Sequence, residues 1–280
     1  MKTLQVAAML LSVLHVSLLH AQTSSSEDSR AAELGSLNGR FLFDGDPPKV
    51  AGTSRFDAID LDTKVSRDSV GRVSGVELAY REYLQLGIRP KTDDCSLLIS
   101  EDGGIANVVV FATSTNIADS ANKGVKPKPA VVRIENGQFV PRVLAVATTE
   151  PIRIENGDAI GFGFHLQAIR NQPVNLFLAP ESKKELTFSR PEKFPMPFRS
   201  DHQIWATGFI LIHDNPYCAI SSTDGSFKIT GLPIGKWEFR AWHEKAGYLQ
   251  HWPNGSFTVE IQAGNNELGD LQLSPDLFLR

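Results

Sequence analysis

The sequence predicts an all-β protein built from two β-sandwiches. The chain has 280 residues, enough for one large or two modest domains, and 41% of them are apolar. Short apolar segments recur along the chain, and turn residues separate them about every eight to twelve residues. This spacing is typical of β-sandwiches and not of alternating strands and helices.

The N-terminus has the pattern of a secretory signal peptide. Lys2 supplies a positive charge, the apolar run Leu4–Leu19 follows, and Ala21 is a small residue suited to cleavage. A membrane anchor is the alternative, but an apolar run of about 15 residues is short for crossing a bilayer. We therefore expect a signal peptide at residues 1–21, no transmembrane segment after its cleavage, and a periplasmic or extracellular protein. Residues 22–36 are polar and Ser-rich, which predicts a disordered leader.

The first part of the fold is expected to contain three strands and one helix. Val76–Leu86 places its apolar residues on one helical face. Asp57–Val70 is acidic and lacks the spacing of a calcium loop, so a solvated loop is expected. The expected strands are Leu37–Phe43, Ser96–Ser100 and Ala106–Ala112.

The middle of the chain is expected to hold the larger sandwich. Asn136-Gly137 favours a type I′ turn that joins Val131–Glu135 to Gln138–Val140 in a hairpin. The further strands expected here are Val143–Thr148, Pro151–Glu155, Phe162–Leu166, Val174–Leu178, Glu185–Ser189 and Trp205–Ile212.

The segment Ala219–Trp242 predicts two strands joined by a hairpin-like connection. Asp224-Gly225 marks the turn before the first strand, and Pro233–Gly235 the turn before the second. Apolar residues alternate with polar ones in both, as in half-buried strands. Two more strands are expected at Gly255–Ile261 and Leu268–Leu273. The expected core residues are Phe227, Ile229, Leu232, Trp237 and Phe239, with Val108, Val110 and Leu211 from earlier strands.

Two parts of the chain resemble known families. The motif D-G-x-F-x-I-x-x-L-P-x-G-x-W-x-F, from Asp224 to Phe239, resembles the carboxypeptidase regulatory-like family, a transthyretin-like sandwich that usually carries no catalytic residues. Gly104–Phe111, Asn156–Asp158, Ser200–Ile212 and Trp242–Tyr248 resemble exported cupredoxin-like proteins of the methylamine-utilisation-like type. The resemblance implies a cupredoxin-like Greek key at residues 37–214, followed by a small transthyretin-like sandwich at residues 215–275.

The same resemblance implies that the copper ligands of the family are lost. The family has a His four residues after the Asn-x-Asp turn and a C-x-x-H motif, but this chain has Phe162, Ser200 and Gln203 at those positions. A blue-copper site needs a thiolate and two imidazoles. His165 and His202 lie near these positions and could supply imidazoles if the register shifted. We therefore predict no metal, catalytic or cofactor-binding residue, and no cofactor.

Two cysteines follow the expected signal peptide. Export would allow Cys95 and Cys218 to form a disulfide, and two buried thiols are the alternative.

The sequence favours a binding or structural role over catalysis. The net charge of −4 is mild and argues against a nucleic-acid partner. No G-x-S-x-G or H-E-x-x-H motif is present, so no enzyme is expected. Trp237 and Trp242 should face opposite sides of a strand, leaving Trp242 either at an interdomain contact or exposed as a platform for sugar or peptide.

These observations predict an exported, non-enzymatic binding or structural protein with a protein or carbohydrate ligand. Two alternatives stay open. One is a periplasmic electron carrier with an atypical copper site, and the other is a carbohydrate-binding module.

Overall fold

The structure is a computed structural model that describes residues 34–47, 69, 72, 74–92, 94–113, 129–148 and 150–279. The expected signal peptide and the acidic residues Asp57, Asp60, Asp62 and Asp68 lie outside the described residues, as does most of the expected leader. Within the described ranges, no helix is long and apolar enough to cross a bilayer.

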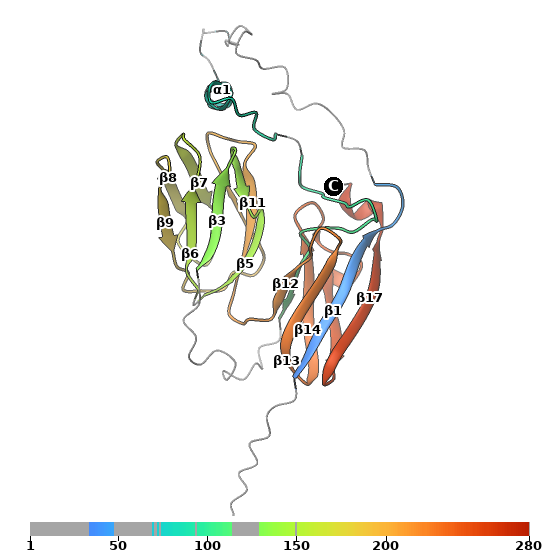
Figure 1. The fold of residues 1–280 in the computed structure, drawn as a ribbon. Helices are drawn as coiled ribbons and strands as arrows, with labels where there is room; N and C mark the ends of the chain where they lie inside the picture. Colours follow the sequence, from blue (N-terminus) through green and yellow to red (C-terminus); the bar gives the residue numbers. More distant parts are fainter. Residues whose placement is uncertain are drawn as a thin grey trace, which may run out of the picture. The chain divides into compact units, whose positions relative to one another are not determined.

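The prediction of an all-β protein with two sandwiches is confirmed (Figure 1). We call them the middle sandwich and the C-terminal sandwich. One sheet of the middle sandwich has the strand order β4-β3-β6-β9, and the other has the order β5-β11-β10-β7-β8. The strands of the first sheet are β3 (Ala130–Glu135), β4 (Gln138–Val140), β6 (Ile152–Asn156) and β9 (Lys183–Leu186). Those of the second are β5 (Val143–Ala147), β7 (Phe162–Leu166), β8 (Val174–Leu178), β10 (Met196–Arg199) and β11 (Thr207–His213).

Alternation along the strands builds the core of the middle sandwich. In β7, Phe162, Phe164 and Leu166 point into the core, while His165 between them is half-buried. The hairpin between β3 and β4 turns at Asn136 (φ 52°) and Gly137 (φ 74°), the two positive φ angles of the expected type I′ turn.

The C-terminal sandwich also has two sheets. The first has the order β13-β1-β17, with β1 at its centre, antiparallel to β13 and parallel to β17. Its strands are β1 (Leu34–Phe43), β13 (Ser226–Pro233) and β17 (Gly264–Leu273). The second sheet consists of β2 (Val109–Ala112), β12 (Cys218–Ile220), β14 (Gly235–His243), β15 (Gly247–Tyr248) and β16 (Ser256–Ile261).

This sandwich differs from the expected one in where its strands come from. Residues 215–275 were expected to form it, but β1 and β2 from the first part of the chain lie inside its sheets. β1 begins at Leu34, so the last residues of the expected leader are strand. The reason is hydrophobic burial: the inward side chains of β1, such as Leu37 and Phe41, share one core with Phe227 and Phe239.

The expected hairpin-like connection within Ala219–Trp242 is a crossing between sheets. β13 pairs with β1, whereas β14 pairs with β2, β15 and β16. Gly235, at φ 130°, lies at the turn between the two strands. Both strands still bury their alternating apolar residues in one core. The expected core residues are therefore all buried: Phe227, Ile229, Leu232, Trp237, Phe239, Val108, Val110 and Leu211.

The expected helix is confirmed as α1 (Gly75–Gln85). Other elements differ from the sequence prediction. The expected strand Ser96–Ser100 forms one isolated bridge, between Ile99 and Ile105, and β10 was not expected. Two short 3-10 helices, η2 (Pro253–Gly255) and η3 (Pro275–Phe278), follow late in the chain.

A separate apolar cluster joins residues of the two sandwiches. It contains Val109, Phe111 and Trp242 from the C-terminal sandwich with Val143 and Leu211 from the middle one. The ring of Trp242 lies 5.0 Å from that of Phe209. The outer face of β11 is therefore covered by apolar contacts.

Candidate functional site

The two positions that should hold the Cys and one His of a copper site are buried and bonded to each other. The side chains of Ser200 and Gln203 lie in the loop after β10 and are 1% and 2% exposed. Ser200 Oγ donates to Gln203 Oε1 at 2.6 Å and accepts from the backbone N–H of Gln203 at 3.1 Å. The hydroxyl thus holds the loop together without a metal.

The third position lies next to the same loop. Gln203 Nε2 donates to the carbonyl oxygen of Gly161 at 3.3 Å, and a Cβ added at Gly163 would lie 3.1 Å from Ser200 Oγ. Phe162, between these glycines, is fully buried, with its ring 5.3 Å from that of Phe139. Ser200 and Gln203 are therefore bonded to each other beside the strand that carries Phe162, whose ring packs inside the core. A hydroxyl, an amide and a phenyl ring offer copper no thiolate or imidazole.

Helix α1 packs against this end of the middle sandwich. Tyr80 and Tyr83 are fully buried, and both pack edge-on against the ring of Trp205, which lies in the same loop as Ser200. Trp205 Nε1 donates to the carbonyl oxygen of Gly137 at 3.0 Å. The helix and the loop thus close the end of the sandwich with aromatic contacts.

A buried carboxylate ties α1 to the sandwich. Asp158 is 6% exposed; it accepts from Tyr83 Oη at 2.6 Å and from the backbone N–H groups of Asn136 and Gly137 at 2.8 Å each. Burial, and then the hydrogen bond to Asp158, raise the pKa of Tyr83 above its ordinary value, so the phenol stays protonated as the donor. Sequence reasoning found the helix but missed this contact, because no local pattern pairs Tyr83 with a residue 75 positions away.

The histidines considered as rescue ligands are a residue bonded to a carboxylate and a residue exposed to solvent. His165 Nδ1 lies 3.1 Å from Asp201 Oδ2, and His202 is exposed in the loop. Cys218 instead lies beside His213, with 3.3 Å between Sγ and Nε2. Among the described residues, no group of three His, Cys, Asp or Glu side chains could hold a metal ion.

The two cysteines are free thiols. Burial, with a smaller effect of Glu150, raises the pKa of Cys218 to about 12. At neutral pH the thiol is protonated and is a poor nucleophile.

The W-H-E-K segment, which begins in the last residues of β14, holds a largely buried ion pair. Arg142 donates to the Glu244 carboxylate through Nε at 2.7 Å and through Nη2 at 2.8 Å. Nη2 also donates to Thr207 Oγ1 at 2.9 Å. Burial raises the pKa of Glu244, and Arg142 opposes that shift. Next to Glu244, burial lowers the pKa of His243 to about 4. This arrangement fixes a contact between Arg142 in the β4–β5 turn and Glu244 after β14.

The exposed-platform hypothesis for Trp242 is wrong, because its side chain is 7% exposed. Trp237 lies in the core of the C-terminal sandwich, so the two rings face opposite sides of β14 as expected. Trp252 is half-buried, with its ring stacked 4.4 Å from that of Phe257.

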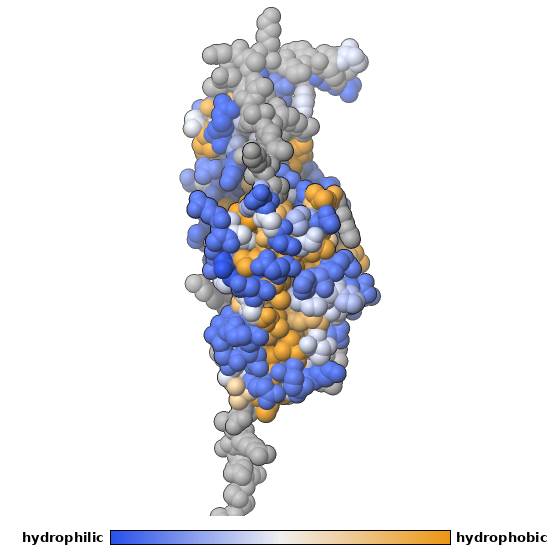
Figure 2. Space-filling view, turned by 90° about the vertical axis from the view of Figure 1, so that its right-hand side faces the viewer, coloured by the Kyte–Doolittle hydropathy of each residue, from blue (hydrophilic) through white to orange (hydrophobic). Residues whose placement is uncertain are grey.

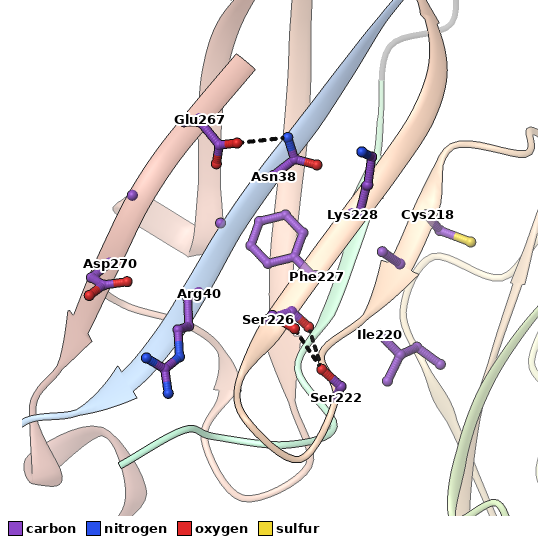
Figure 3. A pocket seen from close by; sticks show the side chains of 13 residues that line it. Asn38, Arg40, Cys218, Ile220, Ser222, Ser226, Phe227, Lys228, Glu267 and Asp270 are labelled. Atoms are coloured by element: carbon purple, nitrogen blue, oxygen red, sulfur yellow. Dashed lines mark hydrogen bonds between the residues drawn. The ribbon is translucent and has the colours of Figure 1, made fainter. Parts of the chain in front are cut away.

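A shallow pocket of about 750 Å³ lies on the C-terminal sandwich (Figure 3). Two rows of side chains cross β13, β1 and β17 in register: Lys228, Asn38 and Glu267 in one row, and Ser226, Arg40 and Asp270 in the other. Arg40 Nε donates to the carbonyl oxygen of Asp224 at 2.7 Å. Positive and negative charges balance across the pocket, so its electrostatics favour no ion of either sign.

Apolar side chains gather on the face of the molecule that Figure 2 shows, in a band flanked by polar residues. β16 and β17 each lie at the edge of a sheet of the C-terminal sandwich. Val259, Leu268 and Leu271 on these strands are half-buried and pack against the core. These side chains therefore cover the core of the C-terminal sandwich along the edge strands of its two sheets.

Comparisons with known proteins found copper proteins among solved structures. The chain is similar to a copper-containing nitrite reductase from Thermus scotoductus (16% identity, TM-score 0.30), with 35% of this chain matching 25% of that one. It is also similar to a purple cupredoxin from Nitrosopumilus maritimus (14% identity, TM-score 0.26), with 30% of this chain matching 98% of that protein. A proline-to-glycine variant of amicyanin matches 37% of the chain at 15% identity and a TM-score of 0.28, over 98% of its own length.

The chain therefore spans a quarter of the nitrite reductase's length. No known family profile and no curated protein sequence matches the chain.

Proposed function

We propose that the protein is an exported, non-enzymatic binding or structural protein whose cupredoxin-like sandwich works without copper. One observation carries the proposal. Ser200 and Gln203 are buried and bonded to each other, and Gln203 Nε2 donates to the carbonyl oxygen of Gly161. Converting this loop to a metal site would require breaking buried hydrogen bonds for side chains that are weak copper ligands.

The C-terminal sandwich supports the second half of the proposal, a fused transthyretin-like domain. Its two sheets enclose one core, and the D-G-x-F motif supplies β13 and β14 to opposite sheets. Gly225, in the Asp-Gly turn of the motif, has φ 83°, and a Cβ there would lie 2.2 Å from the carbonyl oxygen of Phe41. These are packing roles, as expected for a domain without catalytic residues.

The alternative is an electron carrier that holds copper through His165 and His202. A melting experiment separates the two. Cu²⁺ or Zn²⁺ at micromolar concentration should leave the melting temperature unchanged, because only a ligand that prefers the folded state stabilises it. A rise of several degrees that His165→Ala or His202→Ala abolishes would support the electron carrier and contradict the proposal.

A further inference from the structure

The outer face of β8, β7 and β10 presents an exposed aromatic ring beside polar side chains. Phe177 on β8 is 70% exposed. The register pairs Phe177 with Gly163, Asn175 with His165, and His165 with Arg199. Directly opposite residues on neighbouring strands share a face of the sheet, so these five residues lie on one surface.

Two glycines on this face lie beneath other groups, Gly161 beneath the ring of Phe177 and the buried Gly163 beside Ser200. A Cβ at Gly161 would lie 2.1 Å from Cζ of Phe177, so the tip of the ring lies against bare backbone. A Cβ at Gly163 would lie 3.1 Å from Ser200 Oγ. The ring of Phe177 therefore extends from β8 over the start of β7, on the sheet face that also carries His165 and Arg199.

One carboxylate orients the polar groups. Asp201 Oδ2 lies 3.1 Å from His165 Nδ1, and Asp201 Oδ1 accepts from Arg199 Nε at 3.3 Å. This leaves the other imidazole nitrogen and the terminal guanidinium nitrogens for a ligand. The side chains of His165, Arg199 and Asp201 are 22%, 52% and 46% exposed, so they can be reached from solvent. The charges of Arg199 and Asp201 cancel.

The rest of the same sheet face is already used for packing. Phe209 on β11 contacts Trp242 of the C-terminal sandwich, and Leu211 lies in the same apolar cluster. Phe177, three strands away, stays open to solvent. A single exposed apolar residue needs no explanation, but a ring held over a glycine on the same face as an oriented donor–acceptor group has the composition of a binding site.

We infer that this surface, the Phe177 face, binds a neutral pyranose unit of a carbohydrate. The ring offers an apolar plane to the C–H face of a sugar. The carboxylate, imidazole and guanidinium groups can accept from and donate to its hydroxyls. Because the local charges cancel, the face attracts a neutral polyol better than an ion. The inference rests on the proposed binding role and names a ligand class for it.

A glycan array tests the inference directly. The chain without residues 1–21 is labelled and applied as wild type, Phe177→Ala and Ile169→Ala. Ile169 is 67% exposed on the same sandwich and serves as the matched control. We expect binding to at least one neutral glycan, weakened at least about tenfold by Phe177→Ala, equivalent to about 1.4 kcal/mol. Ile169→Ala should bind as the wild type does.

Amide NMR locates the bound glycan. Titration with the best array ligand should shift the amide signals of Gly161 and Gly163. The inference is overturned if no arrayed glycan binds, if Phe177→Ala binds as well as wild type, or if the shifts gather around Trp252 instead. Copper binding in the melting experiment would overturn the proposed function and leave this result standing, so the two failures are distinguishable.

Discussion

Replacing Tyr83 with Phe tests whether α1 is held to the end of the middle sandwich by its buried hydroxyl. The substitution removes one oxygen and keeps the ring that packs on Trp205. The lost bond joins Tyr83 Oη to the Asp158 carboxylate at 2.6 Å, with both residues buried. Hydrogen bonds to charged groups contribute about 1.5–3 kcal/mol. Asp158 keeps two backbone N–H donors, so we expect a loss near the lower bound, about 1.5 kcal/mol.

The assay is guanidinium chloride unfolding followed by tryptophan fluorescence. Tyr248→Phe is the matched control, because it removes the same atom from an exposed bond to the carbonyl oxygen of Lys193. A surface change of this kind should stay within about 0.5 kcal/mol. The midpoint should fall for Tyr83→Phe with an unchanged slope. Equal stability of the two variants would refute the claim that this bond secures the helix.

Three further predictions concern packing, pH and backbone. Phe162→Ala should lower the free energy of unfolding by about 3–5 kcal/mol, whereas Phe177→Ala, at an exposed position, should change it by less than about 0.5 kcal/mol in the same denaturation assay. Burial lowers the pKa of His243 to about 4, so between about pH 6.5 and 4 this imidazole is protonated in the unfolded state and neutral in the folded state. The stability of the wild type should therefore fall as the pH falls through that window. His243→Gln should flatten this part of the profile, and an unaltered profile would count against the buried neutral imidazole. Gly225→Ala should destabilise the folded protein far more than Gly231→Ala. The two glycines have similar φ angles, but a Cβ at Gly225 meets backbone atoms whereas a Cβ at Gly231 lies in open space. Equal melting temperatures of the two variants would contradict the close approach at Gly225.

The sequence predicted the local features of the fold well. Periodicity placed α1 within one residue at each end, and Asn136-Gly137 predicted the type I′ turn from its backbone preference. Burial of residues such as Phe239 followed from two-residue alternation alone. These features depend on neighbouring residues, so one sequence contains enough information to predict them.

The pairing of strands that lie far apart along the chain was not predicted from the sequence. Nothing near Leu37 indicates that β1 pairs with β13 and β17, more than 180 residues further along the chain. For the same reason β13 and β14 were expected as a hairpin although they lie in different sheets. β10 was missed because Pro197 lies inside it, and proline argues against a strand interior.

The candidate site was predicted in part. The resemblance picked out Phe162, Ser200 and Gln203, and the structure brings Ser200 and Gln203 together against the β7 segment that contains Phe162. The role of α1 could not be predicted, because it depends on side chains that meet only in three dimensions. The Phe177 face was missed likewise, since its members come from three strands.

The central claim is that the end of the middle sandwich at Ser200 and Gln203 is closed by the protein's own side chains. Copper content measured after expression in copper-rich medium tests it most directly. The wild type is compared with the variant Phe162→His/Ser200→Cys/Gln203→His, which places a thiolate and two imidazoles at the three positions. We expect no stoichiometric copper and no visible charge-transfer band for the wild type, whatever the variant binds. One equivalent of copper per wild-type chain, with a visible band, would contradict it.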